Sequence, residues 1–152
     1  MKRNGWLRVA VAMGIALWTL CIWWQSLLPA EKSAANSEAV MQLLDPTAED
    51  TAEQTLAART EGHQRVYSLR KVAHFAEFAV LGGLWGWLAL LWKRRFLGLG
   101  GLLTGVVDEC LQFFAPGRAP MGKDVLIDMG GYLCGLALVW VIFLLLRKKK
   151  QN

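Results

Sequence analysis

The chain has 152 residues, of which 55% are hydrophobic, and it carries a formal net charge of +5. That length would suit one soluble domain, but the apolar residues run in long blocks between clusters of charge, as membrane-spanning segments do. The basic residues flank these blocks and do not line one polar face, which argues against nucleic acid as a partner and favours anionic lipid head groups.

The first apolar block, at residues 6–28, predicts a membrane-spanning helix preceded by a short cytoplasmic N-terminus at 1–5. A cleaved signal peptide is the alternative, since basic residues precede the block and alanines follow it. However, the block is as long as a bilayer core is thick, and Trp6, Trp23 and Trp24 mark its ends like an aromatic belt. We therefore expect a retained helix.

Residues 29–70 are polar, acidic and rich in alanine, and we expect them to form an extracytoplasmic loop and not a domain. The segment 37–44 predicts a short amphipathic helix that ends at Asp45-Pro46. Thr47 with Asp50 resembles a capping box for a second helix, and Glu61-Gly62 predicts the next break.

The remaining apolar blocks form a core at 71–146 with three more predicted spans, at 72–92, 96–115 and 124–146. Only Lys93–Arg95 separates the first two of these, so they are predicted to form a tight antiparallel hairpin. A turn rich in proline and glycine joins the last two. A basic cytoplasmic tail at 147–152 ends the chain.

The positions of the basic residues predict the orientation. Both termini and the Lys93–Arg95 turn are basic, and four spans place all three on one side, which the positive-inside rule assigns to the cytoplasm. Each of the last three spans also carries two glycines four residues apart, a spacing that lets helices approach closely in lipid. The pairs are Gly82/Gly86, Gly101/Gly105 and Gly131/Gly135. The expected fold is all-α, an integral membrane four-helix bundle with both termini inside (N-in/C-in).

Polar residues within the spans indicate a functional site, because ionisable groups are costly inside a membrane. In the predicted topology they occupy the outer halves of their helices, and spacings of three or four residues place each group on one face. Arg118 lies above them in the outer turn. The predicted binding residues are Lys71, His74, Glu77, Asp108, Glu109, Gln112, Arg118, Asp124 and Asp128.

Three interpretations of this cluster remain open. The charges could simply pair and hold the helices in register. Histidine and carboxylates at helical spacing also resemble metal sites in bundles, but the order here is His74-x-x-Glu77 and not Glu-x-x-His, so we assign no metal and no cofactor. The cluster could also be catalytic, and the candidates for acid–base chemistry are then Asp108, Glu109 and His74.

Three motifs resemble those of the VanZ-like family, over about residues 69–140. They are Lys71-x-x-His74-Phe75-x-Glu77-Phe78, Asp108-Glu109-x-x-Gln112-Phe113-x-x-Pro116-Gly117-Arg118 and Asp124-Val125-x-x-Asp128-x-x-Gly131-x-x-x-Gly135. Phe78 and Asp128 depart from the pattern, since the family usually has Tyr and Asn at these positions.

The family is named for a protein associated with resistance to the glycopeptide teicoplanin. The resemblance implies a bacterial, multi-pass protein of the inner (cytoplasmic) membrane with membrane lipids as partners. It also implies a role in teicoplanin resistance, but it supplies no mechanism. From the polar cluster we expect binding of the lipoglycopeptide or of a lipid-linked cell-wall precursor at the outer leaflet. The alternative is an intramembrane enzyme acting on a lipid head group. A proton or ion pathway ranks below both, because the inner halves of the spans are nearly all apolar.

Overall fold

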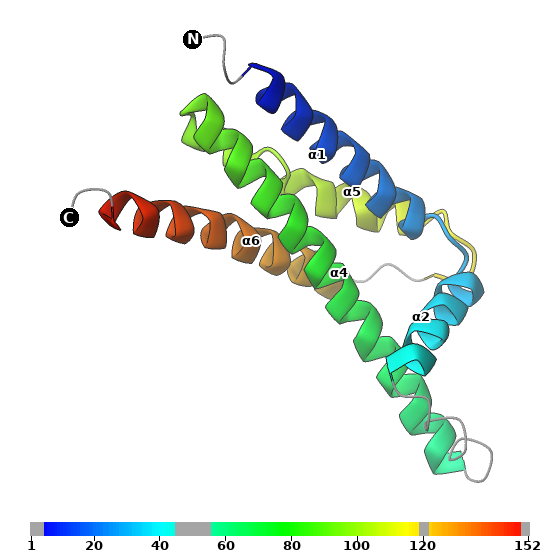
Figure 1. The fold of residues 1–152 in the computed structure, drawn as a ribbon. Coiled ribbons are helices and arrows are strands. Elements are labelled where there is room, and N and C mark those ends of the chain that lie inside the picture. The colour runs from blue at the N-terminus through cyan, green and yellow to red at the C-terminus, as the bar shows by residue number, and fades with distance from the viewer. Residues whose placement is uncertain (1–4, 45–55, 119–121, 150–152) are drawn as a thin grey trace.

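The computed structural model describes residues 5–44, 56–118 and 122–149. These residues form helices joined by turns, with no strand among them, which confirms the predicted all-α class. In chain order the helices are α1 (Gly5–Ser26), α2 (Ala30–Leu44), α4 (Leu56–Trp92), the 3₁₀ helix η2 (Arg95–Leu99), α5 (Leu102–Gln112) and α6 (Gly122–Lys149) (Figure 1).

Three helices of the described chain are long and apolar enough to cross a membrane: α1, the Tyr67–Trp92 part of α4, and α6. Large apolar side chains stand exposed around α1 and α6, for example Trp6, Leu17, Leu138 and Ile142. A helix that is hydrophobic all round is typical of a lipid-facing span. These features support a membrane protein.

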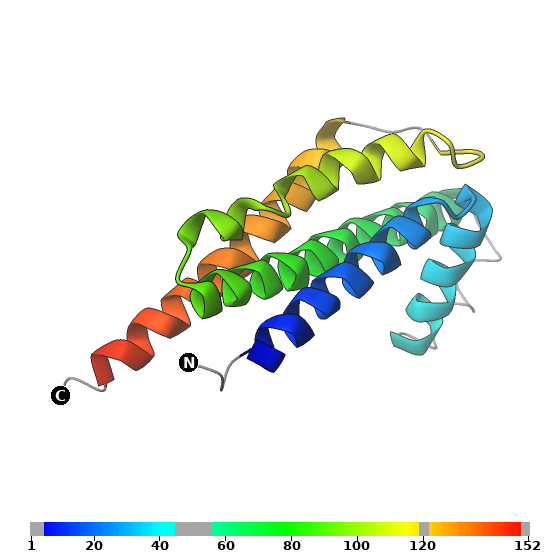
Figure 2. The same ribbon diagram turned by 90° about the horizontal axis from the view of Figure 1, so that it is seen from above.

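Glycines set the packing of α4 against α6, the most extensive helix pair in the structure. A Cβ built on Gly135 would lie 1.8 Å from the carbonyl oxygen of Ala79, and one on Gly131 would lie 2.2 Å from that of Phe75. The contacts advance in the same direction along both helices, so α4 and α6 run parallel (Figure 2). Two of the predicted small-residue pairs therefore contribute to close helix approach, through Gly131 and Gly135 on α6 and Gly82 on α4.

The segment predicted as the third span, 96–115, is not one continuous helix. It consists of η2 and the 11-residue helix α5, which carry the chain back from the C-terminal end of α4 to the N-terminal end of α6 (Figure 2). The buried hydroxyl of Tyr132 lies at the break, where it donates a hydrogen bond to the carbonyl of Gly98 (2.7 Å) and accepts one from the N–H of Gly101 (3.1 Å). Tyr132 thus satisfies backbone groups that the interrupted helix leaves without intrahelical partners.

The predicted outer loop contains more helix than expected. Helix α2 begins at Ala30 and not near residue 37, and α4 already begins at Leu56. The break predicted at Glu61-Gly62 is wrong, since α4 passes through both residues. The capping box predicted at Thr47 and Asp50 falls outside the described residues.

At one end of the molecule lie Arg8 from the start of the first predicted span, Arg95 from the predicted Lys93–Arg95 turn and Arg147 from the predicted basic tail. Three guanidinium groups lie over aromatic rings: Arg8 is 5.8 Å from the Trp92 ring, Arg95 is 5.9 Å from Trp140, and Arg147 is 5.6 Å from Phe143. This end comprises the start of α1 and the ends of α4 and α6 (Figure 1). The polar residues of the predicted site lie toward the opposite ends of these helices.

Candidate functional site

A buried polar cluster forms where the C-terminal end of α1 meets α4, α5 and the first turns of α6. At its centre Asp108 of α5 is fully buried. The hydroxyl of Ser26 donates a 2.6 Å hydrogen bond to Asp108 Oδ1, and Gln112 Nε2 donates a 3.1 Å bond to Oδ2. The end of α1 is thereby joined to α5 through the side chain of Asp108.

His74 of α4 lies between two carboxylates. Its Nδ1 is 3.7 Å from Asp128 Oδ1 and 4.0 Å from Asp108 Oδ2. Both distances exceed those of a hydrogen bond, so the three groups lie close together without direct bonds between them. Asp128 is 1% exposed, and neither of its carboxylate oxygens has a hydrogen-bond partner among the described residues.

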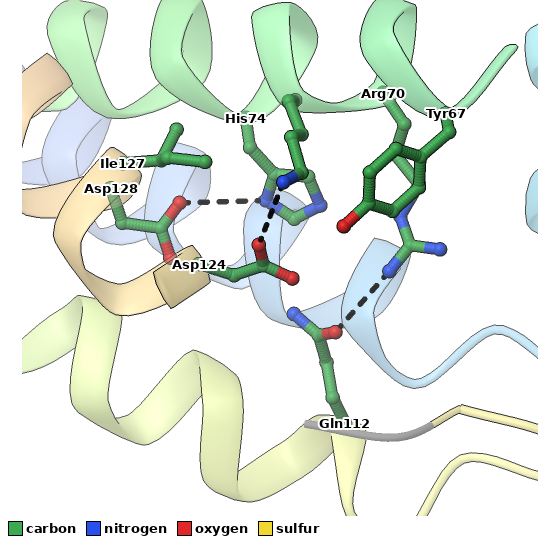
Figure 3. Close-up of a pocket in the computed structure, with 8 residues that line it drawn as sticks. Tyr67, Arg70, His74, Gln112, Asp124, Ile127 and Asp128 are labelled. Carbon is green, nitrogen blue, oxygen red and sulfur yellow. Dashed lines mark hydrogen bonds and ion pairs between the residues drawn. The ribbon is translucent and has the colours of Figure 1, made fainter. Parts of the chain in front are cut away.

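A small cavity of about 10 Å³ opens beside His74 and Asp128 (Figure 3). This volume has room for roughly one water-sized species. At its mouth Lys71 Nζ lies 3.9 Å from Asp124 Oδ1 and 4.4 Å from the centre of the Tyr67 ring. On the other side Arg70 Nη2 donates a 3.4 Å hydrogen bond to Gln112 Oε1. The cavity is therefore lined by the buried carboxylate of Asp128 and by the basic side chains of Lys71 and Arg70.

Two of the predicted acidic residues lie at the margin of this cluster. Glu77 faces α1, where Gln25 Nε2 donates a 2.9 Å hydrogen bond to its Oε1 and the indole of Trp18 donates to its backbone carbonyl (2.9 Å). Glu109 accepts a 3.2 Å hydrogen bond from Gln112 Nε2 and is mostly buried. Gln112 thus bonds to both neighbouring carboxylates of α5.

Arg118 follows the turn after α5, where Gly117 adopts a φ of 73° that suits glycine. Its Nη2 donates a 3.2 Å hydrogen bond to the carbonyl of Gln25, while its Nε and Nη1 have no such partner among the described residues. Burial lowers the pKa of the Arg118 guanidinium from its ordinary value, and Arg70 lowers it further, against the opposing effect of Asp108 and Glu109. An arginine nevertheless stays charged at neutral pH, so Arg118 adds a fixed positive charge beside the cluster.

A wide, apolar groove lies next to the polar cluster, between α5 and the start of α6. Its volume is about 430 Å³, and its walls are Val106, Glu109, Cys110, Phe113, Phe114, Gly122 and Val125. Glu109 lies in the groove and is bonded to Gln112, which lines the small cavity on the other side. A hydrogen bond therefore joins a residue that lines the apolar groove to a residue that lines the polar cavity.

Three residues of the cluster were not predicted from the sequence, namely Arg70, Gln25 and Ser26. Arg70 lies four residues before His74 and shares its helix face, so the spacing of three or four that grouped the other residues includes it. Gln25 and Ser26 form a polar pair at the end of an apolar span. No spacing rule relates them to Asp108, which is 82 residues further along the chain than Ser26.

Comparison with known proteins identifies the family. The family model described as VanZ/LLP1 matches residues 11–145, which is most of the chain. The chain therefore belongs to the VanZ-like family, as its motifs predicted. No curated protein and no solved structure matches it.

Proposed function

We propose that this member of the VanZ-like family is a binding protein of the bacterial inner membrane that contributes to teicoplanin resistance. Its ligand is the lipoglycopeptide itself or a lipid-linked cell-wall precursor, held at the outer leaflet. The observation that supports this proposal is that a polar cavity and an apolar groove both lie against α5 and the start of α6, where the hydrogen bond from Gln112 to Glu109 joins a residue of one to a residue of the other. A ligand with a charged head group and an acyl chain needs both surfaces, and they must be adjacent.

The proposed arrangement in the membrane has four crossings with both termini in the cytoplasm. Basic residues at one end favour the cytoplasmic side, which leaves the polar cluster near the outer leaflet. The third crossing consists of η2 and α5 together. With about 2.0 Å rise per residue in η2 and about 1.5 Å in α5, their combined length is roughly 27–30 Å, close to the thickness of a bilayer core.

The charges of the site suit an amphipathic ligand that carries both acidic and basic groups. Arg118 has two guanidinium nitrogens without hydrogen-bond partners among the described residues, and guanidinium binds phosphate or carboxylate through paired donors. Lys71 and Arg70 add positive charge at the cavity entrance. The carboxylates accept hydrogen bonds from amines and hydroxyls, and the groove beside Phe113 and Phe114 offers apolar surface for an acyl chain.

Growth inhibition by teicoplanin and by vancomycin tests this proposal, because only teicoplanin carries an acyl chain. The host is a susceptible bacterium that lacks an outer membrane, and it expresses the wild-type chain or a variant at equal level. Wild-type protein should raise the inhibitory concentration of teicoplanin and leave that of vancomycin nearly unchanged. Glu109→Gln and Arg118→Ala should lose this protection.

The matched controls for this assay lie away from the cluster. Glu31→Gln changes an exposed carboxylate of α2, and Arg95→Ala removes an arginine at the opposite end of the molecule. Both controls should protect like the wild type. Equal protection against the two drugs would refute recognition of the acylated ligand, and full protection by Arg118→Ala would exclude the cluster as the binding site.

A second candidate function is an intramembrane enzyme that acts on a lipid head group. The observation that favours it is the short distance between His74 and Asp108, both of which are suited to acid–base chemistry. Glu109 is the other candidate base. Turnover of a lipid head group by purified protein, abolished by Glu109→Gln while ligand binding persists, would favour the enzyme over the binding protein.

A further inference from the structure

Three potential metal ligands from three different helices converge in the polar cluster. They are His74 on α4, Asp108 on α5 and Asp128 on α6, and one ligand atom of each lies within 4.8 Å of the other two. The measured separations from His74 Nδ1 are 3.7 Å to Asp128 and 4.0 Å to Asp108. Ligands of a tetrahedral zinc ion, at 2.0–2.2 Å from the metal, lie roughly 3.3–3.6 Å apart, so small side-chain movements would bring these three atoms to that spacing.

Asp128 provides the independent observation that points to a cation. Its side chain is 1% exposed and turned toward His74, and neither of its oxygens has a hydrogen-bond partner among the described residues (Figure 3). A buried carboxylate without hydrogen bonds is strongly disfavoured, particularly in a membrane. Lys71, the nearby ammonium, pairs with Asp124 and not with Asp128. A bound cation would satisfy both orphaned oxygens.

The surroundings of Asp108 are those of a positioned metal ligand. Ser26 and Gln112 each donate a hydrogen bond to one of its two oxygens, which fixes the orientation of the carboxylate. Each carboxylate oxygen accepts more than one interaction, so Oδ2 can still face His74 at 4.0 Å. Hydrogen bonds of this kind hold the ligands of protein metal sites in their binding geometry.

We propose that His74, Asp108 and Asp128 bind a divalent transition-metal ion of the zinc or manganese type. One imidazole and two carboxylates are a ligand set that such ions accept, and the two negative charges balance the charge of the ion. Three protein ligands leave at least one coordination position open, and the cavity of about 10 Å³ beside His74 and Asp128 adjoins it. If the proposed function holds, an oxygen of the bound head group fills that position.

Metal binding by the purified full-length chain in detergent tests this proposal without any glycopeptide. Protein stripped with a chelator is dialysed against Zn²⁺ alone or Mn²⁺ alone, and the bound ion is counted by mass spectrometry. One ion per chain is expected. Asp128→Asn and His74→Asn should weaken the affinity by at least about tenfold. A wild-type chain that binds neither ion would overturn the proposal.

The control variant is Glu77→Gln, which changes a carboxylate of the same cluster that is bonded to Gln25 and lies outside the three ligands. It should retain wild-type affinity, and an equal loss in Glu77→Gln and Asp128→Asn would contradict the assignment. Electron paramagnetic resonance of Mn²⁺ bound to the wild type tests the site even if a variant does not fold. Coupling to a single imidazole nitrogen is expected, and its absence would exclude His74. If the protein binds the metal ion but gives no protection against teicoplanin, the proposed function is refuted and the metal site is not.

Discussion

Replacing Gly135 by alanine tests the packing on which the polar cluster depends. The added Cβ would lie 1.8 Å from the carbonyl oxygen of Ala79, 1.6 Å short of the 3.4 Å at which ordinary van der Waals contact begins. The same Cβ would lie 2.6 Å from the carbonyl carbon of Ala79 and 2.9 Å from its Cα. These are backbone atoms of α4, which cannot rotate away as a side chain would, so the two helices have to separate.

Separation of α4 and α6 weakens every contact along their interface. The neighbouring approaches are equally close, with 1.9 Å from a Cβ on Gly82 to the carbonyl oxygen of Tyr132. Overpacking costs about 1–3 kcal/mol, and we expect Gly135→Ala to lie at the upper end because the obstacle is backbone. A loss of about 3 kcal/mol raises the unfolding constant roughly a hundredfold.

Reversible unfolding in mixed detergent micelles, followed by the fluorescence of the eight tryptophans, measures this loss. Gly83→Ala is the matched control, because it lies in the same interface but its Cβ would find Val139 at an ordinary 3.7 Å. This control should change the free energy of unfolding by less than about 1 kcal/mol, with alanine favoured in the helix. Equal stability of Gly135→Ala and Gly83→Ala would refute the close approach of α4 and α6.

Two hydrogen bonds give further predictions in the same unfolding assay. Ser26→Ala removes the 2.6 Å bond to buried Asp108 and should cost about 1–3 kcal/mol. Ser37→Ala is the control, because the Ser37 hydroxyl donates to the backbone carbonyl of Ser33 within α2, and it should cost much less. Similar effects of the two variants would contradict the central role of the Ser26 bond. Tyr132→Phe leaves the carbonyl of Gly98 and the N–H of Gly101 without their partner, so it should cost about 1–3 kcal/mol and speed amide hydrogen exchange at Gly101. Unchanged exchange at Gly101 would show that the tyrosine does not stabilise the break.

The sequence predicted best the helices that contain a long apolar block, although α4 begins at Leu56, well before its predicted span. The predicted spans 72–92 and 124–146 lie within α4 and α6, because charge clusters bound their apolar blocks on both sides. The third span, 96–115, was predicted as one helix because it too is a single apolar block. Its break depends on Tyr132, a residue more than thirty positions away that bonds to the backbone, and no local pattern reveals such a contact.

The polar cluster was predictable to the extent that it depends on helix periodicity and depth. Residues such as His74 and Asp128 share the faces of their helices that their spacing indicates, and the structure brings them together with Asp108. The end of α1 was not part of that prediction. Ser26 enters the cluster because α1 packs against α5, which is a matter of tertiary structure.

The glycine contacts and the polar cluster occupy one continuous part of the α4–α6 interface. Phe75, whose carbonyl faces Gly131, directly follows His74, and Gly131 lies three residues after Asp128 and so on the same face of α6. Short side chains such as aspartate and histidine reach each other across two helices only where the backbones approach closely. In lipid, small residues provide that approach, and polar groups in the same place are shielded from the apolar surroundings. The glycines of α6 therefore do more than stabilise the packing of α4 on α6, because the close approach that they allow also brings His74 and Asp128 to 3.7 Å from each other.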